Sequence, residues 1–146
     1  MNYQINDNKF LEESLTQLEF QSVLDFVCKY SYSELGKEII AKSRPTDHLF
    51  WLKIEHELIE EMLLVLSQDD PLPFDGLTDI RSKLHKSLVQ NAVLSPIEIL
   101  EIRDCIRVSR LIRQFFINRK EKYSSLFQET ERLHDNRLLE KHIDET

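Results

Sequence analysis

The sequence predicts an all-α fold, an irregular bundle of about six or seven helices with one long helix near residues 96–118. The chain of 146 residues holds only two glycines and four prolines, too few for the many tight turns of a strand-rich fold. Hydrophobic residues make up 41% and charged residues 31%, which is the range of globular domains. Apolar residues recur with helical rather than alternating spacing.

Helix boundaries follow from local signals in the sequence. Phe20, Val23, Leu24 and Val27 share one face of a first helix, and Ser33 can cap the next. Pro45 ends that second helix, because the residue before a proline is pushed out of the α region. The periodic segments together predict seven helices, at about 18–30, 33–43, 46–67, 80–88, 96–118, 124–134 and 137–143.

The helix predicted at 46–67, with Thr46 and Asp47 at its cap, carries a long apolar seam. This seam consists of Trp51, Ile54, Leu58, Met62 and Val65, and it is widened by Leu52, Ile59 and Leu66. Because it persists over four turns, it suits packing along a neighbouring helix.

The helix predicted at 96–118 has the strongest start signal in the chain. Ser95 at the cap, Pro96 at the first helical position and Glu98 three residues after the cap match a capping box. Its apolar positions then change face, from Ile99, Ile102 and Ile106 to Val108, Leu111, Phe115 and Phe116. We therefore expect different neighbours to pack against its two ends.

The domain prediction has two parts, a flexible lead-in at residues 1–15 and a single helical core segment at 16–146. The N-terminus shows no signal peptide, and no apolar run approaches the roughly 20 residues of a membrane span. Cys28 and Cys105 lack paired spacing and suit buried positions in a reducing compartment. We expect a cytoplasmic protein without membrane contact.

The chain lacks the residues that several kinds of functional site require. Glycines do not cluster, so a phosphate-binding loop is excluded, and His56-Glu57 begins a zinc-helix pattern whose second histidine is replaced by Glu60. We therefore predict no catalytic, cofactor-binding or metal-binding residue in this chain.

One basic stripe is the candidate site. Arg103, Arg107, Arg110 and Arg113 lie three or four residues apart on one side of the helix predicted at 96–118. Such a row can contact phosphates. The net charge of −7 favours another interpretation, a solvated face or pairing with acidic residues of the helix at 46–67, namely Glu55, Glu57, Glu60 and Glu61.

Four stretches, in order, carry a resemblance to a known family. They are Leu18-Glu19-Phe20, Ser33-Glu34-Leu35-Gly36-Lys37-Glu38 ahead of Arg44-Pro45, Gly76-Leu77-Thr78-Asp79-Ile80-Arg81, and Val93-Leu94-Ser95-Pro96. Their order and spacing resemble the N-terminal core and lever segment of the second MutS subfamily, over about residues 16–145. Family members are MutS-like ATPases and endonucleases that lack the mismatch-binding domains.

The resemblance implies a truncated part of a larger protein. In the full-length protein it implies ATP and Mg²⁺, downstream lever and ATPase domains of the same chain as partners, a homodimer, and action on branched DNA or stalled ribosomes. The segment itself would be non-catalytic and would link substrate engagement to the ATPase. The alternative is a stand-alone helical interaction module that offers its apolar seam to a partner protein; a stand-alone enzyme ranks third.

Overall fold

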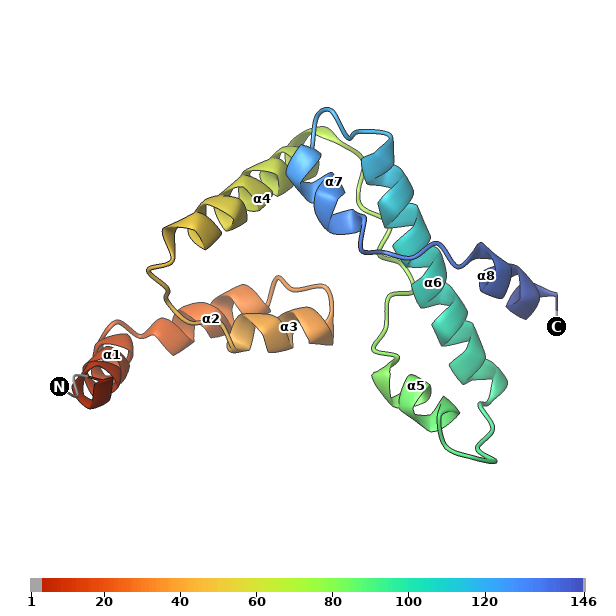
Figure 1. The fold of residues 1–146 in the computed structure, drawn as a ribbon, viewed down its shortest axis with the longest axis horizontal. Helices are drawn as coiled ribbons and strands as arrows, with labels where there is room; N and C mark the ends of the chain where they lie inside the picture. The colour runs from red at the N-terminus through yellow and green to blue at the C-terminus, as the bar shows by residue number, and fades with distance from the viewer. Residues whose placement is uncertain (1–3, 146) are drawn as a thin grey trace. The chain divides into compact units, whose positions relative to one another are not determined.

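The computed structural model describes residues 4–145, and its regular structure there is entirely helical (Figure 1). This confirms the predicted fold class, with one helix more than the sequence indicated. The eight helices are α1 (Gln4–Gln17), α2 (Phe20–Cys28), α3 (Glu34–Ala41), α4 (Leu49–Gln68), α5 (Arg81–Ser87), α6 (Pro96–Ile117), α7 (Ser124–Thr130) and α8 (Arg137–Asp144). Within the described residues, none of these helices is long and apolar enough to cross a membrane.

The chain divides into two compact units, Met1–Pro45 and Thr46–Thr146. The sequence predicts one segment from residue 16 onward and gives no sign of this boundary. Residues 43–48, which carry no helix, join the units and are exposed. Helix α1 was also not predicted, because its polar sequence lacks an apolar face; the flexibility of residues 1–15 stays a prediction.

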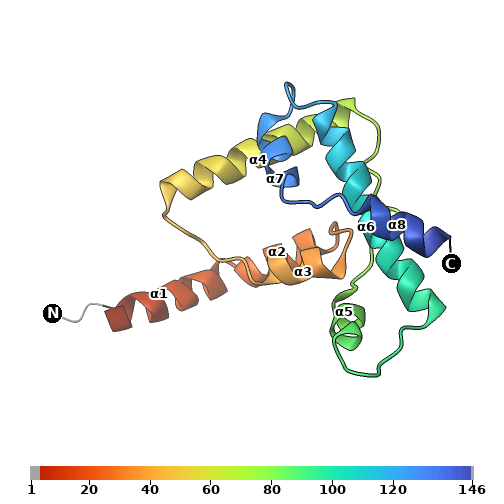
Figure 2. The same ribbon diagram turned by 45° about the vertical axis from the view of Figure 1, so that its right-hand side comes forward.

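The first unit holds α1, α2 and α3. Glu19 separates α1 from α2 by adopting a left-handed backbone, with φ of 52°. Helix α3 packs beside α2 (Figure 2), and Leu24 is the buried apolar residue among those described in this unit. Ser33 caps α3 as predicted, since its Oγ accepts a hydrogen bond from the Gly36 N–H at 3.0 Å.

The core of the second unit lies where α4, α6 and α7 meet. It consists of buried Val65, Phe116, Tyr123 and Leu126, with Leu58, Met62, Leu72, Ile112, Phe115 and Phe127 packed around them. The C-terminal part of the predicted α4 seam therefore packs in the core, as expected. The prediction is wrong for its N-terminal part, because Trp51 and Ile54 are exposed. Helix α7 covers only the C-terminal half of α4 (Figure 1).

The predicted cap of α4 is also wrong. His48, rather than Thr46 or Asp47, occupies the cap position, and its Nδ1 accepts from the Trp51 N–H at 3.3 Å. Thr46 lies two residues before the cap, where its Oγ1 accepts from the His48 N–H. The sequence pointed to Thr46 and Asp47 because histidine is not among the residues preferred at the N-cap.

The predicted capping box of α6 is confirmed. Ser95 Oγ accepts from the Glu98 N–H at 3.3 Å, and a Glu98 carboxylate oxygen accepts from the Ser95 N–H at 2.7 Å. Lys86 also binds this carboxylate, at 2.7 Å, so the ammonium group and then the Ser95 amide lower the pKa of Glu98 to about 2. The start of α6 is thus tied to α5.

The expectation of different neighbours at the two ends of α6 is confirmed as well. Helix α8 contacts α6 around Arg103 and Arg110, whereas α7 packs near Phe116. Val108 and Phe116 are buried, but Leu111 is 37% exposed and does not belong to the core.

Removing the cap hydroxyl should destabilise α6. We expect Ser95→Ala to lower the free energy of unfolding by about 1 kcal/mol, because an N-terminal amide loses its acceptor. Chemical denaturation followed by circular dichroism measures the change. Ser67→Ala is the matched control: its hydroxyl bonds within α4, to the Leu64 carbonyl, so its loss should cost nothing. Equal stability of Ser95→Ala and wild type would contradict the capping role.

Candidate nucleic-acid interface

The predicted basic stripe lies on α6, where its four arginines follow one another at helical spacing. Arg103, Arg110 and Arg113 are partly buried, and Arg107 is the most exposed. A phosphate-binding row needs guanidinium groups that are free to face solvent. The partners of each arginine therefore decide what this stripe can do.

Helix α8 provides carboxylates for two of the arginines. Arg110 donates from Nε and Nη2 to the two carboxylate oxygens of Glu140, at 2.9 and 2.8 Å. This two-point pairing raises the pKa of Arg110 and lowers that of Glu140. Two turns earlier in α6, Arg103 Nη1 donates at 2.8 Å to Asp144 Oδ1, which lies one turn after Glu140 in α8. Helix α8 is thus fixed along the basic side of α6.

Asp104 adds a third carboxylate within α6 itself. Its Oδ1 lies 3.0 Å from Arg103 Nε and 3.8 Å from Arg107 Nη2, and the closer contact is an ion pair without hydrogen-bond geometry. Gly76 packs against Asp104: an added Cβ there would lie 3.0 Å from the Asp104 Cβ, and the φ of Gly76 is +91°. Among the described residues, Arg113 Nε is buried without a hydrogen-bond partner.

Arg103, Arg107 and Arg110 therefore pair within the chain, but with other residues than those of α4 that the sequence suggested. Their carboxylates come from α8 and from Asp104, not from α4. Glu61, one of the predicted α4 partners, instead accepts from the backbone N–H groups of Ser125 and Leu126, at 3.1 and 2.8 Å. It closes the start of α7, a role that no local sequence signal indicates because 64 residues separate Glu61 from Ser125.

A second basic group follows α6, and two of its cations share one carboxylate. Asp69, at the end of α4, accepts from Arg119 Nε at 2.8 Å, from Lys122 Nζ at 3.0 Å and from the Tyr123 hydroxyl. The Arg119 guanidinium also stacks on Phe115, 3.9 Å from the ring centre. Asp69 lies 50 residues before Arg119 and 53 before Lys122, so no local sequence pattern indicates this cluster.

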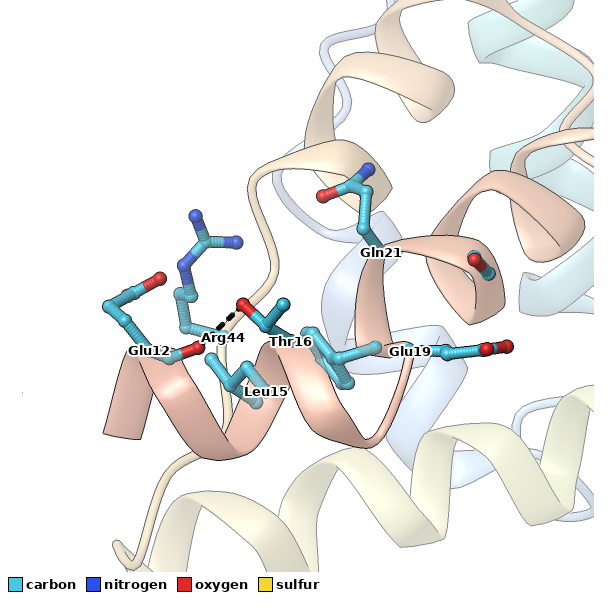
Figure 3. Close-up of a pocket in the computed structure, with 8 residues that line it drawn as sticks. Glu12, Leu15, Thr16, Glu19, Gln21 and Arg44 are labelled. Atoms are coloured by element: carbon cyan, nitrogen blue, oxygen red, sulfur yellow. Dashed lines mark hydrogen bonds between the residues drawn. The ribbon is translucent and has the colours of Figure 1, made fainter. Parts of the chain in front are cut away.

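The structure also contains shallow hollows. One of about 360 Å³ lies in the first unit, between α1, the start of α2 and Arg44 (Figure 3). Figure 3 shows Glu12 and Arg44 on its rim, and Thr16, whose hydroxyl donates to the Glu12 carbonyl at 2.8 Å. Another, of about 480 Å³, is lined by three acidic and three basic residues beside α8. Within the described residues, no three His, Cys, Asp or Glu side chains gather where they could hold a metal.

Comparison with known proteins relates these helices to a segment of MutS-like proteins. No family model and no solved structure matches the chain. Curated relatives do. An endonuclease MutS2 from Pelotomaculum thermopropionicum is 33% identical over 117 residues, which cover 80% of this chain and 15% of the relative. Endonuclease MutS2 from Geobacillus thermodenitrificans is 32% identical over 115 residues, which cover 79% and 14%.

The chain is therefore related to a segment of the endonuclease MutS2 proteins, as the sequence resemblance indicated. It spans about 15% of the length of the relatives it matches. A third relative, from Halothermothrix orenii, is 29% identical over 71% of this chain and 13% of its own length. The likeness thus covers most of this chain and a small part of each relative.

The four stretches that carried the resemblance have a common structural role. Each contains a residue that starts or orients a helix: Glu19 makes the left-handed turn before α2, and Ser33 caps α3. Gly76 turns against α6, and Ser95 begins it. The stretches that carry the resemblance are therefore places where a helix begins or the chain turns, and the stripe of arginines follows the last of them.

Acid should loosen the junction at Asp69. Hydrogen bonds from Tyr123, Arg119 and Lys122 lower the pKa of Asp69 below its ordinary value of 3.8, so the folded chain favours the carboxylate. Its stabilising contribution is present above that value and is lost as the pH falls below it. We expect the melting temperature of Asp69→Asn to change less between pH 5 and pH 2 than that of wild type.

Thermal melts across this pH range test the assignment. Asp70→Asn is the matched control, because Asp70 is the exposed neighbour outside the cluster, and it should keep the wild-type pH profile. The same profile in wild type and Asp69→Asn would show that other carboxylates govern acid unfolding.

The ion pairs of the stripe arginines give a prediction about binding to DNA. We expect the 146-residue chain to show no saturable binding to a labelled four-way junction at low ionic strength, because carboxylates already occupy Arg103 and Arg110 and the net charge of −7 repels phosphate. Replacement of Arg103, Arg107 and Arg110 by glutamine should change nothing. Fluorescence anisotropy measures both. Micromolar binding that disappears in the triple variant would assign the stripe to DNA.

Proposed function

We propose that this chain is a non-catalytic helical core segment of a MutS-like DNA-processing protein. In this role it links substrate engagement, on branched DNA or a stalled ribosome, to a downstream ATPase that binds ATP and Mg²⁺. The supporting observation is its relation to a segment of endonuclease MutS2 that makes up about 15% of those proteins. In addition, the described residues form packed helices, and among them there is no glycine-rich nucleotide loop and no cluster that could hold a metal.

Helix α6 is the element suited to transmit a movement. Its 22 residues span roughly 33 Å at 1.5 Å per residue. Three neighbours hold it at separate points: α5 through Lys86, α8 through Glu140, and α4 with α7 through the core at Phe116. A displacement at one of these points moves the whole rigid helix, and so reaches the others.

The interaction-module alternative has its own support. The face of α4 that α7 leaves uncovered carries exposed Trp51, Ile59, Leu63 and Leu66. Exposed apolar side chains in such a row are typical of surfaces that bind another helix. This surface is compatible with the core-segment role, since a part of a larger protein also needs faces for its neighbours.

A chimera tests the coupling. This chain replaces the matched segment of the Pelotomaculum thermopropionicum relative, and ATP hydrolysis is measured with and without branched DNA. The isolated chain should release no phosphate above buffer and cut no DNA. The chimera should hydrolyse ATP, and Arg110→Gln within it should lower the DNA stimulation at least threefold, because α8 loses its two-point contact with α6.

The control is Arg132→Gln, since Arg132 is highly exposed and its ion pair with Glu129 lies three residues away in the same segment. It should leave DNA stimulation unchanged, and the basal rate should be the same in both variants. Equal stimulation in Arg110→Gln and Arg132→Gln would contradict a transmitting role for the α6–α8 contact. Phosphate release by the isolated chain would contradict the non-catalytic assignment.

A further inference from the structure

Helix α8 is held on α6 more by charge than by apolar packing. Among the described residues of α8, none is buried. Leu138 is 87% exposed and Leu139 47%, while Ile143 is half-buried. The Glu140 side chain, by contrast, is only 12% exposed, and Arg110 binds it at two points. Ion pairs with the arginines of α6 therefore carry much of the attachment.

The length of α8 also makes its attachment reversible. The helix has eight residues, and residues 131–136, which lead into it, carry no helix (Figure 1). Isolated helices shorter than roughly 12–15 residues are marginally stable in water, so α8 needs α6 to stay helical. A hollow of about 480 Å³ opens beside the contact between Arg110 and Glu140. A segment with so few buried apolar contacts opens locally at a low cost in free energy.

The face of α6 under α8 fits a helix that carries two carboxylates one turn apart. Glu140 and Asp144 are four residues apart, so they project from one side of α8, about 6 Å apart along its axis. Glu140 meets Arg110 and Asp144 meets Arg103, so the two helices run antiparallel. Arg107 lies between these two arginines, with a side chain that is 44% exposed. We call Arg103, Arg107 and Arg110 the docking row.

The docking row favours a protein helix over a nucleic-acid strand as its occupant. Asp104 belongs to α6 itself and lies 3.0 Å from Arg103 Nε, so it stays in the row when α8 leaves. Gly76 packs against Asp104 and restricts its movement. A continuous phosphate backbone meets this fixed carboxylate and the net charge of −7 with a charge on every nucleotide. A helix places only two carboxylates, and places them beside the arginines.

We propose that the docking row binds acidic amphipathic helices, and that α8 is the resident occupant, which covers the row until another such helix replaces it. The partner helix carries two carboxylates four residues apart, each preceded by an apolar residue, as Leu139 precedes Glu140 and Ile143 precedes Asp144. Because α8 belongs to the same chain, its effective concentration is high, and it excludes weak competitors. This inference does not rest on the proposed link to an ATPase.

Fluorescence anisotropy with a labelled peptide tests the docking row. The peptide has the sequence of residues 135–145, lengthened at its N-terminus by two turns of alanine so that it forms a helix more readily. The receiving protein is the 146-residue chain with Glu140→Gln and Asp144→Asn, in which the resident helix has lost its carboxylates. This neutralised chain should bind the peptide with micromolar affinity. Wild type should bind it at least tenfold more weakly, because α8 competes.

Two controls separate this site from a general effect of charge. The chain with Glu57→Gln and Glu60→Gln loses the same number of charges from exposed positions of α4, and it should bind the peptide as weakly as wild type. A peptide in which glutamine and asparagine replace both carboxylates should not bind the neutralised chain. Circular dichroism verifies that every variant of the chain remains helical.

An exchange of charges is the decisive arm. Arg110→Glu, added to the neutralised chain, should abolish binding of the peptide, and Glu140→Arg in the peptide should restore it. No binding to the neutralised chain at high micromolar concentration would overturn the proposal, and so would binding that Arg110→Glu leaves unchanged. Displacement of the peptide by a DNA four-way junction would assign the docking row to nucleic acid and contradict a protein helix as its occupant.

Discussion

The second unit depends on one partly buried carboxylate. Asp69 ends α4, and by binding Arg119, Lys122 and Tyr123 it fixes where the chain turns from α6 into α7. Tyr123 is fully buried beside Phe116, so its ring fills the core while its hydroxyl reaches Asp69. Because a buried polar group is costly without a partner, this bond restricts the junction to one arrangement. The register of α7 against α4, and with it the cap that Glu61 provides, follows from that restriction.

Most basic side chains along α6 and the turn after it lie beside a carboxylate. Arg103, Arg107 and Arg110 of α6 each have a carboxylate nearby, from α8 or from Asp104. Arg119 and Lys122 in the turn after α6 share Asp69. A chain of net charge −7 can hold its arginines in such pairs and still keep an acidic surface. If a larger protein uses the arginine side of α6 to hold a polyanion, α8 must first move away. The position of α8 is therefore the variable that decides whether the stripe is available.

Local patterns predicted the helices and their boundaries well. The capping box at Ser95, the cap at Ser33 and the long helix near 96–118 depend on residues within one turn, so the sequence contains the whole signal. Failures occurred where the cause lay far away. Trp51 and Ile54 have core periodicity, yet α7 is too short to cover them. The partners of Arg103 and Arg110 lie 41 and 30 residues away, and Glu61 and Asp69 act over 50 residues or more. Pairing over such distances is set by tertiary packing, which no local spacing encodes.

The order of the helices along the chain has a consequence during synthesis. Helix α4 leaves the exit tunnel before the segment that buries its core face, since Glu61 must wait for Ser125, 64 residues later. At ordinary elongation speeds of about 5–20 residues per second, this delay lasts roughly 3 to 13 seconds. Throughout this delay, the apolar seam of α4 faces water. A nascent chain of this kind is a natural client for a holding chaperone, and its yield in a foreign host should depend more on translation speed than on the final stability of the fold.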